Sequence, residues 1–289
     1  MDHEDIHQKR SPKLHPSPKS NDTSWDILTT LRWDSSPSRD AAIQLHDPAH
    51  TIEQCNFYLL PFHRDRMLSA AQAFQRPFPE KLHGDAGLQA FEDMLLGAAL
   101  SHADVFPNSL RIRVLLSEVG QVSITTSALP KSVPSRLLLY PTPLLLKTYL
   151  IDHPPTYRIF LSPYPTSPNL HTRHKTTFRA HYDDLRSLLP NETTDSATND
   201  GLLPEILLYN QDDELMEGTF TTPYLNRDSH LVTPQANAGG NLGTTRRWAL
   251  ERGWCKADHI RKDEIHVGMQ VWLSNSVRGW GWGVVEAWR

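Results

Sequence analysis

The sequence predicts a mixed α/β fold, of the α+β kind, with a small N-terminal domain and a larger C-terminal domain. Three patterns predict it: apolar residues at helical spacing in the first half, short β-rich runs between turn residues in the second half, and a proline-rich stretch between them. At 289 residues, the chain is long enough to bury one large core or two modest ones. We expect a disordered arm over residues 1–24, a small α/β domain over 25–145 and a large domain over 146–289.

The first half is predicted to contain two helices and a hairpin. The segment FYLLPFHRDRMLSAAQAF spaces its apolar residues as a helix does, with Pro61 near its start. A second helical run, AFEDMLLGAALSHA, follows it. In RIRVLLSEVGQVSITTS, two β-rich runs flank a turn at Gly120, which predicts a hairpin.

The second half is predicted to be mainly β-sheet. Prolines between Ser127 and Lys147 interrupt regular structure, so we place the domain connection there. Closely spaced turn residues then predict an antiparallel meander, and a glycine-bearing loop leads into a short helix closed by Gly253. The expected elements are the strands YRIFLSP, EILLYN, LMEGTFTTPYL and HLVTP, the helix TTRRWALERG, and MQVWLSNSVRGWGWG as a strand running into a loop.

Composition excludes several classes of function. A net charge of −4 with scattered Lys and Arg gives no broad basic surface, so nucleic acid is not an expected partner. Cys55 and Cys255 lie far apart without a second Cys or clustered His beside them, so we expect neither a disulfide nor a metal site. The apolar stretch Leu137–Ile151 is short and broken by prolines and Lys147, and the first residues are charged. These features favour a cytoplasmic protein without a membrane segment.

Three polar features could carry chemistry together. Lys175 precedes the strands, Glu217 lies within them, and Thr244 and Thr245 follow Gly243 at a helix start. A helix N-terminus with hydroxyl donors suits a phosphate group, and a carboxylate suits a protonated pyridine nitrogen. Taken singly, each feature also has an ordinary explanation: a solvated lysine, a turn-flanking glutamate and a threonine cap.

Together, these segments resemble the class IV, fold-type IV pyridoxal-phosphate enzymes, which include branched-chain and D-amino-acid aminotransferases and aminodeoxychorismate lyase. The resemblance rests on HKTTFR, EGTFTT, VTP and GTTR, which stand in the family's order and at about its spacing. It extends from about Phe57 to the C-terminus. It implies a small α/β domain, a larger C-terminal domain with a β-barrel-like sheet and helices, a pyridoxal 5'-phosphate cofactor between them, and a homodimer.

The resemblance also assigns roles to individual residues. It makes Lys175 the catalytic lysine that holds the cofactor as a Schiff base and Glu217 the partner of the pyridine nitrogen. The remaining cofactor-binding residues that it implies, all toward the phosphate, are Arg66, Thr244, Thr245 and Ser276. Substrate carboxylates need cationic partners, for which the candidates are Arg111, Arg113, Arg179 and Arg278.

The reaction that the resemblance favours is that of a lyase. Branched-chain aminotransferases have a tyrosine five residues after the lysine, where this chain has Ala180, whereas Arg179, four residues after Lys175, is closer to aminodeoxychorismate lyase. The text from YRIFLSP to SNSVRG is similar to fungal lyase-like members. The implied activity is elimination of pyruvate from 4-amino-4-deoxychorismate to give 4-aminobenzoate, a folate precursor. The alternatives are a class IV aminotransferase acting on branched-chain amino acids, D-amino acids or amines, and a non-catalytic family member.

Overall fold

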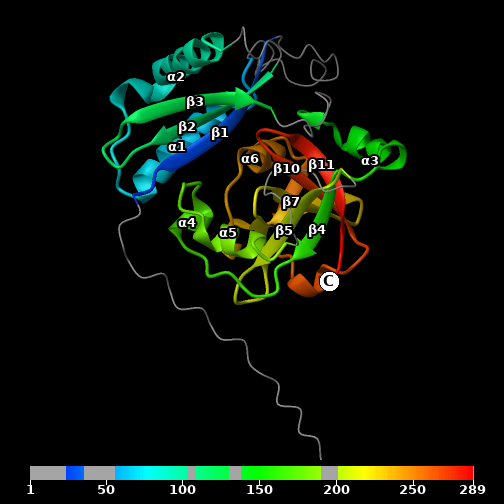
Figure 1. The fold of residues 1–289 in the computed structure, drawn as a ribbon. Helices are drawn as coiled ribbons and strands as arrows, with labels where there is room; N and C mark the ends of the chain where they lie inside the picture. The colour runs from blue at the N-terminus through cyan, green and yellow to red at the C-terminus, as the bar shows by residue number, and fades with distance from the viewer. Residues whose placement is uncertain (1–23, 36–55, 103–108, 130–137, 190–200, 289) are drawn as a thin grey trace, which may run out of the picture.

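A computed structural model describes residues 24–35, 56–102, 109–129, 138–189 and 201–288. Their strands form two separate sheets, one of three strands and one of eight (Figure 1). The predicted arm lies outside the described residues except for Ser24, and so does Cys55. No helix in the described part of the chain has the length and apolar character needed to cross a membrane.

The small domain is a three-stranded antiparallel sheet with helices against one face. The helices supply Met67, Phe91 and Leu95 to a core that the sheet completes with Leu31 and Ile112. Burial alternates along the middle strand, so every second side chain points away from the helices. The elements of this domain are β1 (Ile27–Asp34), α1 (Leu60–Ala73), η1 (Glu80–Leu82), α2 (Gly84–Leu100), β2 (Ser109–Leu116) and β3 (Val122–Ala128).

The large domain is built on a mixed eight-stranded sheet in the order β6-β5-β4-β11-β10-β7-β8-β9. The sheet curls, because β6 at one end contacts β7 and β8 near the other end, and Glu214 forms a bridge with Arg261. This curl confirms the barrel-like architecture implied by the motifs. The strands of this domain are β4 (Tyr157–Leu161), β5 (Leu203–Tyr209), β6 (Leu215–Gly218), β7 (Thr222–Arg227), β8 (His230–Pro234), β9 (Cys255–Asp258), β10 (Gln270–Asn275) and β11 (Gly279–Val285).

Short helices connect these strands and cover parts of the sheet (Figure 1). The predicted helix after the glycine-bearing loop is present, and Gly253 follows it with a φ of +68°. The helices are α3 (Pro143–Asp152), α4 (Leu170–Arg173), α5 (Ala180–Arg186), η3 (Ala236–Ala238), α6 (Thr244–Glu251) and η4 (Lys262–Glu264).

The structure corrects three sequence expectations in the second half. The proline-rich connection contains a helix, α3, which begins at Pro143, because proline is tolerated in the first turn, where its missing N–H has no partner to lose. The boundary expected after residue 145 lies within the span of this helix and stays a prediction. The segment LMEGTFTTPYL is two strands rather than one. Its halves pair with different neighbours, β6 with β5 and β7 with β8 and β10, so the expected meander is wrong at this step.

The third correction concerns the C-terminal segment, where the expected loop GWGWG is the strand β11. A tight turn reverses the chain after Asn275, whose side-chain oxygen accepts from the N–H groups of Val277 at 3.0 Å and Arg278 at 2.8 Å. Glycine is needed in this strand because a Cβ at Gly283 would lie 2.4 Å from the carbonyl oxygen of Tyr157 on β4. The glycines that suggested a loop instead allow close strand packing.

Candidate active site

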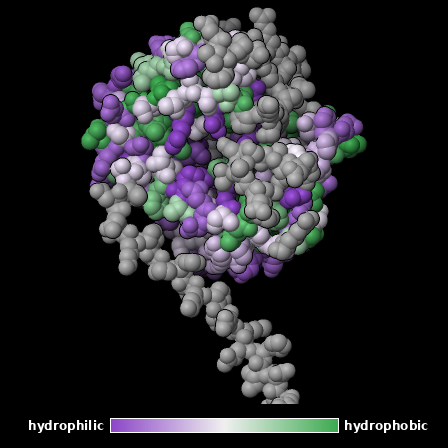
Figure 2. All heavy atoms as spheres, viewed as in Figure 1, coloured by the Kyte–Doolittle hydropathy of each residue, from purple (hydrophilic) through white to green (hydrophobic). Residues whose placement is uncertain are grey.

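Two adjoining cavities lie where the large sheet faces the small domain. The smaller encloses about 50 Å³ and the larger about 470 Å³. On the face in Figure 2, hydrophilic residues gather around a hollow between the two domains. Both cavities are lined by Lys175, Arg179, Phe220, Asn275 and Ser276.

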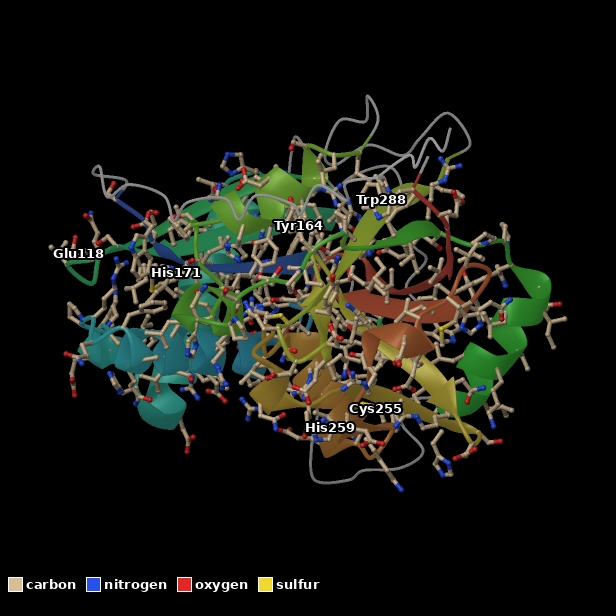
Figure 3. The ribbon with its side chains drawn as sticks, turned by 90° about the horizontal axis from the view of Figure 1, so that it is seen from below. Glu118, Tyr164, His171, Cys255, His259 and Trp288 are labelled. Carbon is tan, nitrogen blue, oxygen red and sulfur yellow. The ribbon has the colours of Figure 1, made fainter. Side chains whose placement is uncertain are left out.

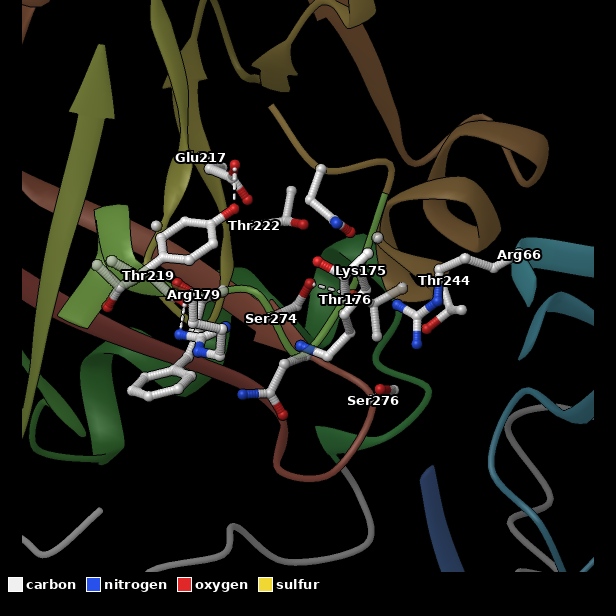
Figure 4. A pocket seen from close by; sticks show the side chains of 18 of the residues that line it. Arg66, Lys175, Thr176, Arg179, Glu217, Thr219, Thr222, Thr244, Ser274 and Ser276 are labelled. Atoms are coloured by element: carbon white, nitrogen blue, oxygen red, sulfur yellow. Dashed lines mark hydrogen bonds between the residues drawn. The ribbon is translucent and has the colours of Figure 1, made fainter. Parts of the chain in front are cut away.

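The smaller cavity collects every residue predicted to bind the cofactor. Figure 4 shows Arg66 entering from the small-domain side and Glu217 from the opposite side, with Lys175 between them. Thr244, Thr245 and Ser276 complete the predicted set. Segments separated by as many as 210 residues in the sequence therefore meet around one space.

Lys175 is held by main-chain contacts with the first strand of the small domain. Its carbonyl oxygen accepts from the N–H of Leu28 at 2.9 Å, and the N–H of Thr177 donates to Asp26 at 2.9 Å. The short helix α4 before it is fixed by a capping box between Asn169 and Thr172. These contacts hold the backbone, so the side chain alone extends into the cavity.

Burial changes the acid–base character of Lys175. Desolvation, followed by the positive charges of Arg179 and Arg66, lowers the pKa of its amine from 10.5 to about 7. A large share of the amine is then neutral near pH 7. A neutral amine can attack a carbonyl carbon and can accept a proton.

Glu217 lies on β6 and is buried. Desolvation raises the pKa of its carboxyl from 4.5 to about 8, against the opposing effects of hydrogen bonds from Tyr182 and the Asn241 main chain and of the charges of Lys175 and Arg179. The Tyr182 hydroxyl donates to Oε1 of Glu217 at 2.8 Å (Figure 4). A carboxyl poised in this way can hold a proton or share one with a basic nitrogen.

Arg66 on α1 closes the small-domain side of the same cavity. Its Nη2 donates to Oγ1 of Thr29, which is also 2.7 Å from Nδ1 of His63. Burial lowers the pKa of Arg66 to about 10, so the guanidinium is still charged at neutral pH. Its Nε has no hydrogen-bond partner within the described residues, which leaves a buried cationic donor in need of an acceptor.

The first turn of α6 provides further donors beside this arginine. Gly243 is its N-cap, and a Cβ there would lie 2.8 Å from Oγ1 of Thr222, so this position must be small. Oγ1 of Thr245 accepts from the Ser274 hydroxyl at 2.7 Å, whereas buried Oγ1 of Thr244 has no partner among the described residues. An unpaired hydroxyl at a helix N-terminus beside the guanidinium of Arg66 suits a phosphate group.

Ser276 lines the smaller cavity and also contacts the small domain. Its hydroxyl donates to the carbonyl oxygen of Thr30 at 2.7 Å and so joins the β10–β11 turn to β1. It lines both cavities, and its oxygen can still accept or relay a hydrogen bond. The residues present therefore fit the phosphate, the ring nitrogen and the carbonyl carbon of pyridoxal phosphate.

The larger cavity brings together all four arginines predicted to bind substrate. Arg111 and Arg113 are on the face of β2 away from the helices, while Arg179 and Arg278 come from the large domain. Hydroxyl side chains of β3, including Thr125 and Ser127, pair with these β2 positions in the sheet. None of the described residues that line this cavity is acidic, so the cavity attracts anions.

Several cavity residues were missed by sequence reasoning. His171 and Thr176, joined between Nδ1 and Oγ1 at 3.0 Å, flank Lys175, and Figure 3 shows His171 beside the small domain. Tyr182 and Phe220 complete the walls of the smaller cavity. Thr176 and Phe220 lie within the matched motifs HKTTFR and EGTFTT, which could have indicated them. Tyr182 lies on a helix that no pattern predicted.

Within the described residues, no group of three or more His, Cys, Asp and Glu side chains could hold a metal ion. Cys255 is buried in the large domain, where burial raises the pKa of its thiol to about 12. Cys255 and His259 line neither cavity, and Figure 3 shows both of them away from His171.

Comparisons with solved structures show the same fold in several proteins of low sequence identity. A branched-chain aminotransferase from Thermoproteus uzoniensis is 13% identical, with a TM-score of 0.61 over 91% of this chain and 79% of that one. The 4-amino-4-deoxychorismate lyase from Pseudomonas aeruginosa is 18% identical, with a TM-score of 0.56 over 90% and 82%. A hypothetical aminotransferase from Mycobacterium tuberculosis in its PLP-bound form is 16% identical, with a TM-score of 0.57 over 91% and 82%.

A search of curated proteins found no match. The family model for amino-transferase class IV, in contrast, matches residues 49–283, which include both cavities apart from the β1 residues. The chain therefore belongs to the class IV aminotransferase family of pyridoxal-phosphate-dependent enzymes, as its motifs predicted.

Proposed function

We propose that this protein is a pyridoxal-phosphate-dependent lyase that converts 4-amino-4-deoxychorismate to 4-aminobenzoate and pyruvate. The observation that carries the proposal is the cavity beside Lys175, which is lined by Arg111, Arg113, Arg179 and Arg278 and by no acidic side chain among the described residues. The substrate has two carboxylates, and several arginines suit such a dianion. The lyase from Pseudomonas aeruginosa shares the fold, as the branched-chain aminotransferase does, so the fold is compatible with either reaction and the choice rests on the cavity.

In this proposal the cofactor is held by the smaller cavity. Arg66, Thr244 and Thr245 bind its phosphate together with the first turn of α6, and Ser276 adds a hydroxyl. Pyridoxal phosphate supplies, when bound, a carbonyl carbon that condenses with primary amines and a ring that accepts electrons from a broken C–H bond.

Lys175 and Glu217 divide the proton chemistry. Glu217 would hold a proton at the ring nitrogen of the bound cofactor. The neutral amine of Lys175 would take the proton from the substrate carbon that bears the amino group. The C–O bond on the neighbouring carbon breaks, the six-membered ring becomes aromatic, and the departing enolpyruvate gains a proton to become pyruvate. The low pKa of Lys175 suits it to accept a proton near neutral pH.

The test is an absorbance spectrum of the purified protein mixed with pyridoxal phosphate, beside that of Lys175→Ala, followed by addition of enzymatically made 4-amino-4-deoxychorismate. We expect a Lys175-dependent band and the release of 4-aminobenzoate and pyruvate in equal amounts. A band without product would overturn the lyase activity but not cofactor binding. If the unaltered protein formed no such band with pyridoxal phosphate, the proposed cofactor site itself would be overturned.

An aminotransferase is the second candidate, because the family includes both activities and the same Lys175 and Glu217 serve either. It would hold an amino acid by one carboxylate and would not need four arginines in the cavity. Transfer of an amino group from branched-chain or D-amino acids to a 2-oxo acid, without formation of 4-aminobenzoate, would favour it.

A further inference from the structure

Tyr182 lines the smaller cavity and contacts two residues already assigned to the site. Its ring is buried, and its hydroxyl donates to Oε1 of Glu217 at 2.8 Å. The guanidinium carbon of Arg179 lies 4.6 Å from the centre of its ring. Tyr182 therefore contacts both the carboxyl proposed to hold the ring nitrogen and an arginine that lines both cavities.

The hydroxyl is a permanent donor in this position. Burial, and then the nearby Glu217 carboxyl, raises the pKa of Tyr182 well above its ordinary value, so the hydroxyl keeps its proton over the working pH range. The guanidinium of Arg179 lies over the electron-rich face of the Tyr182 ring, so a cation–π contact also holds the ring in place. A donor to a carboxylate favours the ionised carboxylate over the neutral acid.

The other groups that face Glu217 also lower the pKa of its carboxyl, but each has a smaller effect than this hydrogen bond. The Asn241 main chain, before α6, forms a hydrogen bond to the carboxyl, and Lys175 and Arg179 act through their charges. Burial opposes all of them. Among the groups that lower the pKa of Glu217, Tyr182 has the largest effect. Its hydrogen bond can be removed by replacing tyrosine with phenylalanine, which deletes only the hydroxyl oxygen.

We propose that Tyr182 is a positioning residue whose hydroxyl orients the Glu217 carboxyl and keeps it ionised when the cofactor is bound. The proposal rests on the proposed role of Glu217 but not on whether the reaction is a lyase or a transfer. Tyr182 is seven residues after Lys175 and is not at the position where branched-chain aminotransferases carry their tyrosine, which is Ala180 here. Ala180 and Tyr182 are two positions apart on α5, so their side chains point about 200° apart around the helix axis. Tyr182 therefore has a separate role.

The first experiment uses the protein without cofactor and so does not depend on the reaction. Infrared spectra follow the carboxylic C=O stretch of Glu217 against pH, and the band is assigned by its absence from Glu217→Gln. In the unaltered protein the midpoint is expected near pH 8. In Tyr182→Phe, which removes only the hydroxyl, it should rise by about one pH unit, because a hydrogen bond to a charged group is lost.

The matched control is Tyr164→Phe, which removes a hydroxyl outside the lining of both cavities and should leave the midpoint unchanged. An unchanged midpoint in Tyr182→Phe would overturn the proposal, even if that variant also melted at a lower temperature. A protein that bound no cofactor would overturn the proposed function, yet it would still give this titration.

The second experiment uses the loaded enzyme and its substrate. Tyr182→Phe should lower kcat about tenfold with little change in KM, since a bond that supports Glu217 is lost while the substrate arginines remain. Added to Glu217→Gln, the same change should have no further effect on kcat. Equal losses in both backgrounds would show that Tyr182 acts independently of Glu217 and would contradict the proposal.

Discussion

Lys175 and Glu217 would carry opposite charges in water, yet burial moves each toward its neutral form. The pKa of the lysine falls to about 7 and that of the glutamate rises to about 8, so near neutral pH the pair can exist without formal charge. Such groups are costly to bury, and they cluster at sites where protons move. At the scale of the residue, the cavity is therefore prepared for a reactive amine and a proton-holding acid.

The lowered pKa of Lys175 predicts the pH dependence of cofactor loading. Only the neutral amine attacks a carbonyl, so the rate at which the Lys175-dependent band forms should rise through about pH 7 and then level off. An ordinary lysine, with a pKa of 10.5, would keep accelerating to a much higher pH. Stopped-flow absorbance from pH 5 to 10.5 measures this, with N-acetyl-lysine as the control. A rate that is still rising at pH 10 would contradict the prediction.

The raised pKa of Glu217 predicts a gain of stability when it is replaced. The carboxyl titrates at about 8 in the folded protein and near 4.5 in the unfolded one. The free-energy cost of burying it as a carboxylate is therefore absent below pH 4.5, grows with pH, and is complete above pH 8. Glu217→Gln should stabilise the cofactor-free protein by on the order of a few kcal/mol at pH 8.5 and by little at pH 4.5. Urea unfolding at the two pH values measures the difference. A gain that is larger at the acidic pH would contradict it.

At the scale of elements, the site depends on loops that approach strands closely. The chain before α6 passes over β6, and a Cβ on Gly240 would lie 2.4 Å from the carbonyl oxygen of Met216. The turn between β6 and β7 is held from below by the buried carboxylate of Glu205, which accepts from the Thr221 hydroxyl at 2.8 Å and the Phe220 N–H at 3.1 Å. These contacts hold the chain before α6 and the wall of the smaller cavity against the large sheet.

This close approach predicts the effect of one added methyl group. Gly240→Ala should destabilise the protein by about 1–3 kcal/mol and weaken cofactor binding, because the loop must move away from β6 to make room. Gly97→Ala is the control: Gly97 lies within α2 with no atom within 4 Å of a new Cβ, so alanine should stabilise by about 0.5–1 kcal/mol. Thermal melts with and without pyridoxal phosphate measure both. Equal melting temperatures in the two variants would contradict the argument.

At the scale of the whole molecule, the larger cavity exists only because two domains meet. The small sheet turns one face to its helices and the other, with Arg111 and Arg113, to the large domain, which contributes Arg179 and Arg278. The alternation of side chains along β2 thus separates the core of the small domain from the surface that lines the larger cavity. Neither domain holds a complete cationic cavity alone.

The shared cavity predicts a defect of substrate binding from a change in the small domain. Arg113→Met should raise KM for the anionic substrate about ten- to hundredfold, since hydrogen bonds to a charged group are lost, while the cofactor band persists. Arg261→Met, which removes a half-exposed arginine outside both cavities, should leave KM unchanged. Steady-state kinetics measure both. An unaltered KM in Arg113→Met would remove this arginine from the substrate site.

The sequence predicted the parts of this molecule that depend on short-range patterns. Helical spacing gave α1 and α2, Gly120 gave the hairpin β2–β3, and motif order brought Lys175 and Glu217 together. It did not predict β1, whose partners lie about 80 residues away, because pairing at that distance leaves no local signal. The assignment of roles to individual site residues, the domain boundaries and the homodimer remain predictions.

The hydrogen bonds between Leu28 and Lys175, and between Thr177 and Asp26, have a consequence for the order in which the protein comes apart. Through them, the start of the small domain fixes the backbone around Lys175, a residue of the large domain. The amide hydrogens of Leu28 and Thr177 should therefore exchange with solvent together, in one opening event. A molecule whose first strand has separated would keep α6 intact, but the backbone around Lys175 would have lost both of these hydrogen bonds, so the position of its amine would no longer be fixed.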